Sequence, residues 1–158
     1  MSDLVLLLKL VHVLGAAVLF GTGAGIAFFM LMAHRTRDAA VVAATARIVV
    51  IADAVFTASA VVLQPVTGTA LVWTIGYPLS TPWIVASLAL YVLVGLCWLP
   101  VVGIQIQLRD LARASAGRGE PLPARYFSLL RIWFWLGWPA FLGVVAIFVL
   151  MLWKPALW

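Results

Sequence analysis

The sequence is poor in charge, cysteine and histidine, and each shortage excludes a class of protein. Charged residues make up 9% of the 158 residues, whereas an ordinary soluble domain carries about 25%, so a soluble fold is excluded. The single cysteine, Cys97, lies in an apolar run, and no disulfide can form within the chain. The two histidines and five acidic residues show no spacing typical of metal ligands or of a hydrolase, so the sequence favours a protein that is not an enzyme.

Long apolar runs dominate what is present. Four of them reach the length of about 20 residues that spans a bilayer, and they cover about residues 4–32, 48–73, 83–108 and 129–153. We therefore predict an all-α fold, an integral membrane four-helix bundle of up-down-up-down topology that forms one transmembrane domain over residues 1–158. The first run is expected to be a retained span, because the preceding MSD contains an acid and no lysine or arginine.

Basic residues predict which side of the membrane each connection faces. Eight arginines flank the first and third connections, and the second connection, WTIGYPLSTPW, carries no charge. Because lysine and arginine gather on the cytoplasmic side, both termini are predicted to lie on the periplasmic side of a bacterial inner membrane. The net charge of +5 then reflects topology, so lipid and not nucleic acid is the expected partner. Lys9 and Lys154 should reach the outer interface, beside an aromatic belt of Trp73, Tyr77, Trp83, Trp153 and Trp158.

Five polar side chains fall at a similar depth in the outer half of the bilayer when residues are counted inward at about 1.5 Å each. They are His12, Gln64, Thr67, Ser87 and Tyr91. Polar groups in hydrocarbon need partners, so we expect these side chains to converge. Three interpretations are open: hydrogen bonds that hold helices together, a binding site on His12 with Gln64 and Tyr91 as cofactor-binding groups, or scatter without convergence.

Asp53 lies toward the cytoplasmic end of the second run, where an acid is costly unless it is paired or hydrated. Arg131 falls at a similar level, so we predict an Asp53–Arg131 pair, with Arg109 or Arg47 as substitutes and Gln105 close by. A structural lock and a proton or ion relay are both open for this group.

The second run carries other features that bear on packing. Asp53, Thr57, Gln64 and Gly68 are spaced 4, 7 and 4 residues apart, which places them on one side of a helix that faces the bundle interior. Gly68 lets a neighbouring helix approach. Pro65 lacks the N–H that would bond to the carbonyl of residue 61, so it predicts a kink.

Glycine and tryptophan patterns predict two further contacts. Gly21 and Gly25 form a G-x-x-x-G, which marks close helix packing within the chain or between copies. A tryptophan cluster is expected in the inner half, either as packed core or as an aromatic wall for a porphyrin or quinone. Its members are Trp98, Trp133, Trp135 and Trp138.

The two histidines limit how a haem would be bound. His12 and His34 lie 22 residues apart on one expected helix, which is roughly 33 Å at helical rise, so they cannot hold one haem within a single subunit. No cofactor is required by the sequence. Haem b is compatible with His12 as the single iron ligand, with His12 and a methionine, or with a site shared across a dimer.

Several short motifs resemble those of a bacterial family of small integral membrane proteins catalogued as domain of unknown function 2269. The motifs are KLVHVLGA at 9–16, FGTGAG at 20–25, AD-x-x-FT at 52–57, LQPVTG at 63–68, GYPLS at 76–80 and CWLPVVGIQ at 97–105. The resemblance covers nearly the whole chain. It implies a four-span membrane protein and supplies no activity.

A looser likeness links the first run to two other families with an early histidine. The stretch from Lys9 through His12 to His34 resembles the first helix of the haem-binding membrane protoporphyrinogen oxidases. That family also uses a lysine on a later helix, and the second and third runs contain none. The copper-resistance D family is the other, although its methionine- and histidine-rich features are missing here.

Three functions follow from these observations. The first is a non-catalytic accessory or structural subunit of a membrane assembly, as a homodimer or within a larger complex. The second is a haem- or porphyrin-binding redox protein centred on His12. The third is a small transporter or ion pathway using His12, Gln64 and Asp53, which the low number of polar residues within the spans disfavours.

Overall fold

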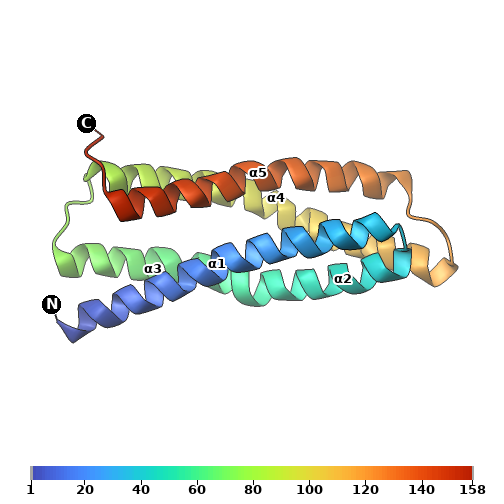
Figure 1. Ribbon diagram of the computed structural model, residues 1–158, viewed down its shortest axis with the longest axis horizontal. Helices are drawn as coiled ribbons and strands as arrows, with labels where there is room; N and C mark the ends of the chain where they lie inside the picture. The colour runs from blue at the N-terminus through green and yellow to red at the C-terminus, as the bar shows by residue number, and fades with distance from the viewer. Residues whose placement is uncertain (1, 158) are drawn as a thin grey trace.

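The computed structural model describes residues 2–157, and these are almost entirely helical (Figure 1). Four helical rods are long and apolar enough to cross a membrane, as predicted. One of them consists of three consecutive segments without a break, α2, η1 and α3. The elements are α1 (Asp3–Thr36), α2 (Ala39–Ala52), the π-helical segment η1 (Asp53–Thr57), α3 (Ala58–Ile75), α4 (Pro82–Arg118) and α5 (Ala124–Trp153).

The helices begin and end at residues suited to those positions. The side chain of Asp38 caps α2 by accepting hydrogen bonds from the backbone N–H groups of Ala40 and Val41, at 2.7 and 3.2 Å. Pro82 occupies the first turn of α4, where its missing N–H costs nothing. Gly76 and Gly119 end α3 and α4 with φ of 85° and 65°, a left-handed conformation that glycine adopts without strain.

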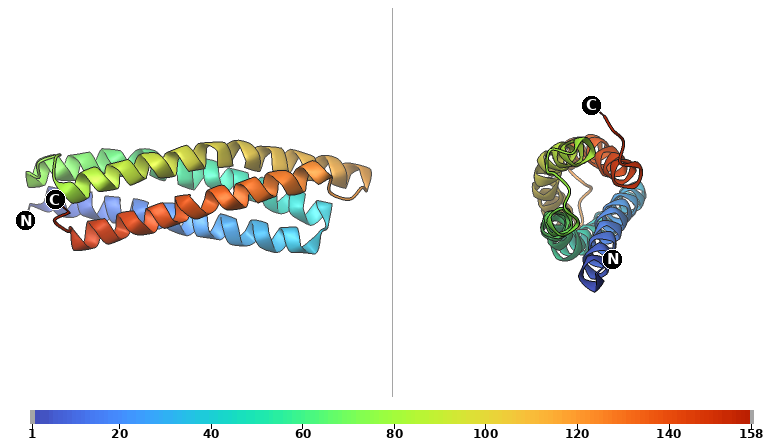
Figure 2. Two further views of the ribbon diagram at one scale, coloured as in Figure 1. Left: turned by 90° about the horizontal axis from the view of Figure 1, so that it is seen from above. Right: turned by 90° about the vertical axis from the view of Figure 1, so that its left-hand side faces the viewer.

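The four rods lie roughly side by side along one long axis (Figures 1 and 2). The start of α1, the end of α5 and the connection from α3 to α4 lie at one end of the bundle, which we call the terminal end. The other two connections lie at the opposite, arginine-rich end. Helix α4 packs along α5 and α2, and α1 packs along α3 and α2. Within residues 2–157, α3 makes little direct packing against α4 or α5.

The apolar core is concentrated toward the arginine-rich end. It joins the second half of α1 to α2, the second half of α4 and the first half of α5, and its most deeply buried side chains are Met30, Val42, Ala46, Leu108, Ala112 and Tyr126. Nearer the middle, the ring of Phe20 on α1 contacts two rings of α5, with centroids 5.1 Å from Phe141 and 5.6 Å from Phe148. The terminal half of the bundle is therefore the less tightly packed half.

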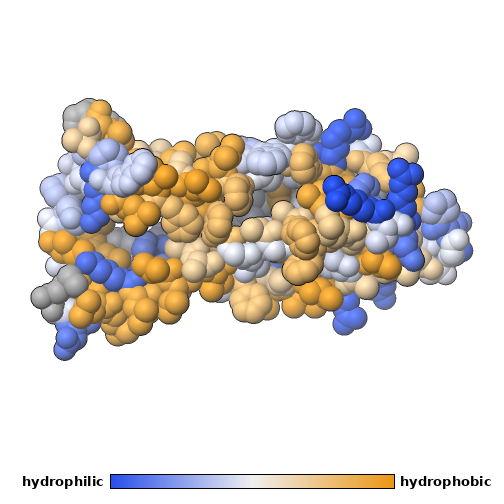
Figure 3. Space-filling model, viewed as in Figure 1, coloured by the Kyte–Doolittle hydropathy of each residue, from blue (hydrophilic) through white to orange (hydrophobic). Residues whose placement is uncertain are grey.

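Large apolar side chains cover the outside of the rods, as expected where lipid is the solvent (Figure 3). Hydrophilic residues gather mainly toward the two ends in this view. At the terminal end, the Nζ atom of Lys154 lies 5.4 Å from the ring centroid of Tyr77 and 5.5 Å from that of Trp83. Trp73 and Trp153 are largely exposed at the same end, and Trp158 lies outside the described residues.

Candidate functional site

Helices α1 and α3 are joined in the terminal half by a polar cluster of three side chains. His12 Nδ1 lies 2.7 Å from Thr67 Oγ1, and Gln64 Nε2 donates a hydrogen bond of 2.9 Å to the backbone carbonyl of His12. Thr67 is buried, and His12 and Gln64 are half-buried. We call His12, Gln64 and Thr67 the histidine cluster. The depth count placed these three together, and the structure does so as well.

The hydrogen bonds of Thr67 indicate which ring nitrogen of His12 carries the proton. The Thr67 hydroxyl lies 2.8 Å from the carbonyl of Leu63 in its own helix, to which it donates. Having one proton, the hydroxyl then accepts from His12, so Nδ1 is the protonated nitrogen. The opposite nitrogen, Nε2, keeps its lone pair, which is the form that ligates metals or accepts protons.

Two glycines allow α1 and α3 to approach this closely. A Cβ on Gly15 would lie 2.6 Å from Gln64 Nε2, and one on Gly68 would lie 3.3 Å from His12 Cε1. Gly68 thus admits a neighbour as predicted. Among residues 2–157 the G-x-x-x-G pair does not pack one helix on another: a Cβ on Gly21 would meet nothing within 4 Å, and one on Gly25 only Phe29 of its own helix.

The other two residues of the predicted convergence form hydrogen bonds outside the histidine cluster. The Tyr91 hydroxyl of α4 donates instead to the backbone carbonyl of Val61 on α3. This is the carbonyl that Pro65 leaves without its helical partner, so α4 supplies the missing donor. Ser87 is buried and donates to the carbonyl of Trp83 in its own helix at 2.7 Å. Three of the five residues are therefore joined by hydrogen bonds, and Tyr91 and Ser87 have other partners.

Asp53 is buried at the start of η1 and is surrounded by neutral hydrogen-bond donors. Trp98 Nε1 of α4 donates to Asp53 Oδ1 at 3.3 Å. With its amide nitrogen turned toward Asp53, Gln105 donates to Oδ2 at 3.3 Å and its oxygen accepts from Trp133 Nε1 of α5 at 3.3 Å. We call these residues the aspartate cluster. It joins three rods, and Thr57 is buried one turn further along the same side.

The predicted Asp53–Arg131 ion pair is wrong. Trp133 is the residue of α5 that turns inward at this level, and Arg131, two positions before it, lies about 200° away around the helix and is exposed. Neither substitute takes its place. Arg109 pairs with Asp110 at 2.8 Å, and Arg47 is exposed. An arginine on an outer helix face reaches water or lipid headgroups without the desolvation that pairing with Asp53 requires.

The aspartate cluster also depends on features that the sequence does not reveal. In η1 the N–H of Ala58 bonds to the carbonyl of Asp53, five residues back, and such π-helical turns are often found at functional sites. The expected cluster of four tryptophans is only half present. Trp98 and Trp133 contribute their N–H groups, whereas Trp135 and Trp138 are 66% and 47% exposed and form no inward wall.

The remaining polar groups place no second ligand near His12. His34, at the far end of α1, stacks on Tyr126 with ring centroids 5.9 Å apart. Among residues 2–157 there is no group of three or more His, Cys, Asp or Glu side chains that could hold a metal ion.

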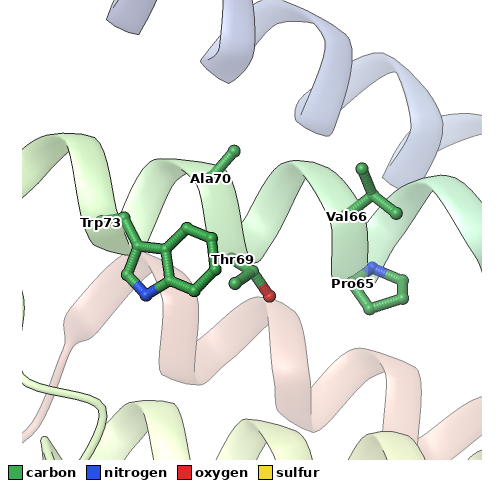
Figure 4. Close-up of a pocket in the computed structure, with 5 residues that line it drawn as sticks. All are labelled: Pro65, Val66, Thr69, Ala70 and Trp73. Atoms are coloured by element: carbon green, nitrogen blue, oxygen red, sulfur yellow. The ribbon is translucent and has the colours of Figure 1, made fainter.

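An apolar groove of about 510 Å³ follows α3 toward the terminal end (Figure 4). Its lining consists of Pro65, Val66, Thr69, Ala70 and Trp73. Figure 4 shows Pro65, Thr69 and the indole of Trp73 following one another along the helix. Thr69 is the sole residue of the lining with a side-chain hydroxyl. We call this feature the α3 groove.

Comparison with known proteins adds a family to this description. No curated protein and no protein of known structure matches the chain. The family model described as "Predicted integral membrane protein (DUF2269)" matches residues 6–155, which is nearly the whole sequence. The chain therefore belongs to this family of predicted integral membrane proteins.

Proposed function

We propose that this protein is a non-catalytic accessory or structural subunit of a bacterial inner-membrane assembly. In this proposal its arginine-rich connections face the cytoplasm, both termini face the periplasm, and the rods run up, down, up and down. The distribution of arginine supports this sidedness. The placement of the first and last helix ends at one end of the bundle is consistent with it.

The main support for this proposal is that the buried polar groups form hydrogen bonds between helices. His12 bonds to Thr67, Gln64 bonds to the carbonyl of His12, and Tyr91 bonds to that of Val61. Each bond crosses from one helix to another, and the aspartate cluster joins rods in the same way. Polar side chains in a membrane bundle commonly hold helices together, and these form hydrogen bonds from one helix to another.

The open side of α1 supports a role within an assembly. Among the described residues, Gly21 has nothing within 4 Å of where a Cβ would lie and Gly25 has only Phe29 of its own helix, and Phe28 and Phe29 are 57% and 58% exposed nearby. Small residues on a lipid-facing helix allow the backbone of another helix to come close. The proposed contact is with a second copy of this chain or with another membrane protein.

Cross-linking in native membranes tests the proposal. A membrane-permeant cross-linker applied to cells that produce the tagged full chain should yield a discrete adduct, either a dimer or a stoichiometric complex. Gly21→Leu with Gly25→Leu should reduce that adduct several-fold. Val92→Leu, at a lipid-facing position 60% exposed on α4, should leave it unchanged. A monomer with no adduct under these conditions contradicts the proposal.

The state of the His12 ring favours a second candidate, a haem- or porphyrin-binding redox protein. Nδ1 is fixed by Thr67, and a histidine ligand is commonly oriented in this way by a hydrogen bond to its other nitrogen. Haem b held through His12 Nε2 would give the purified protein a Soret band that is lost in His12→Ala. A colourless preparation from haem-supplied cells rejects this candidate and leaves the first intact.

A further inference from the structure

We propose that the terminal end carries a binding site for one anionic phospholipid, with an acyl chain in the α3 groove and the phosphate at Lys154. The proposal does not depend on the subunit role. It rests on three features: an apolar groove along α3, aromatic rings in the connection that follows α3 and at the start of α4, and a cation at the end of α5 that contacts those rings.

The groove has the chemistry and direction that an acyl chain requires. It spans residues 65–73 of α3, about 12 Å of helical rise, and so runs along the rod and not across it. Its five lining residues all belong to α3, so the groove lies along the side of one helix. Val66 and Trp73 of the lining are 61% and 72% exposed, so the groove opens to the hydrocarbon of the bilayer.

Tyr77, in the connection that follows the groove, contacts a cation. Trp73 lines the groove, and Tyr77, four residues later, is folded back on α3 by a hydrogen bond of 3.0 Å from its N–H to the carbonyl of Val72. Lys154 Nζ lies over the rings of Tyr77 and Trp83. These cation–π contacts hold the ammonium group at the membrane interface, where phosphates lie.

The charge at this position is not neutralised within the described chain. The ion pairs of residues 2–157 are Arg109–Asp110 and Arg118–Glu120, both toward the arginine-rich end. The connection 76–81 next to Lys154 contains no acidic residue. A positive charge above an apolar groove in a spanning helix is complementary to an anionic lipid, and a zwitterionic lipid gains less from it.

Lipid binding to the purified full chain in detergent, measured by native mass spectrometry, tests the site. Phosphatidylglycerol and phosphatidylcholine with identical acyl chains are the probes. The wild type should retain phosphatidylglycerol preferentially. Lys154→Gln should weaken phosphatidylglycerol binding about five-fold, the effect of about one interfacial charge, and leave phosphatidylcholine unchanged. Lys154→Arg should preserve the preference.

Matched variants separate this site from general lipid adhesion. Val66→Trp fills the groove and should reduce binding of both lipids, whereas Val62→Trp, one turn earlier and 65% exposed outside the groove, should not. Lys9→Gln removes the other lysine near the terminal end and should have no effect. Equal retention of the two lipids by the wild type, or an equal loss in Lys9→Gln and Lys154→Gln, overturns the proposal.

Discussion

The hydrogen bond from Tyr91 to the carbonyl of Val61 is expected to stabilise the bundle only because Pro65 is present. Proline removes the N–H that this carbonyl would accept from within the helix, and the Tyr91 hydroxyl replaces it. Tyr91→Phe then leaves a carbonyl without a partner in an apolar medium. A lost interhelical hydrogen bond in a membrane costs about 0.6–2 kcal/mol, and an unsatisfied buried group about 1–3 kcal/mol, so we expect about 1–2 kcal/mol.

A double-mutant cycle isolates this effect. In the Pro65→Ala background the residue at 65 regains its N–H and can bond to Val61, so Tyr91→Phe should cost less than half of its value in the wild type. The assay is reversible unfolding in mixed micelles, followed by helical circular dichroism. Tyr77→Phe, in a connection and not a span, serves as the control. Equal costs of Tyr91→Phe in both backgrounds would refute the link between Pro65 and Tyr91.

Two further predictions concern the clusters. Gly15→Ala should destabilise the protein by about 1–3 kcal/mol in the same unfolding assay, because the new Cβ would lie 2.6 Å from Gln64 Nε2 and displace a hydrogen-bonded group. Gly21→Ala meets open space and should be neutral or stabilising by up to about 1 kcal/mol through helix propensity. Similar losses of stability in Gly15→Ala and Gly21→Ala would contradict the conclusion that Gly15 and not Gly21 packs against another helix of the chain. Asp53→Leu should cost about 1–3 kcal/mol by leaving buried donors unpaired, whereas Arg131→Gln should change stability by less than about 0.5 kcal/mol. A large loss of stability in Arg131→Gln would instead support an ion pair between Asp53 and Arg131, which the structure does not contain.

The four apolar rods could be predicted from the sequence because lipid imposes a strong and simple pattern on spanning helices. Depth could also be predicted, since helical rise converts residue counts into height. This is why His12, Gln64 and Thr67 were expected to lie at one level. The role of Gly68 in close helix packing could also be predicted, because Gly68 lies on the same side of the helix as Gln64.

The direction in which each side chain points around its helix was harder to predict than its depth. Asp53 and Arg131 lie at comparable heights, but Arg131 is on the outer side of α5 while Trp133 faces inward. Gly15, which no motif marked, faces Gln64, whereas Gly21 of the G-x-x-x-G meets no neighbour among the described residues, so contact between copies is the part of that prediction that stays open. The π-helical turn at Asp53 changes the direction of the residues that follow it, and no sequence signal marked it. The need of a buried tryptophan N–H for a partner was the one clue to Trp98 and Trp133.

Solid-state NMR on histidine-labelled protein in lipid bilayers tests the central claim most directly, namely that the polar side chains at membrane depth bond to one another across helices. His34→Gln leaves His12 as the single labelled ring. We expect Nδ1 to be protonated, Nε2 to be unprotonated, and through-space contacts to join the ring to Thr67 on α3. A ring that instead shows contacts to lipid acyl chains and none to Thr67 would contradict the account.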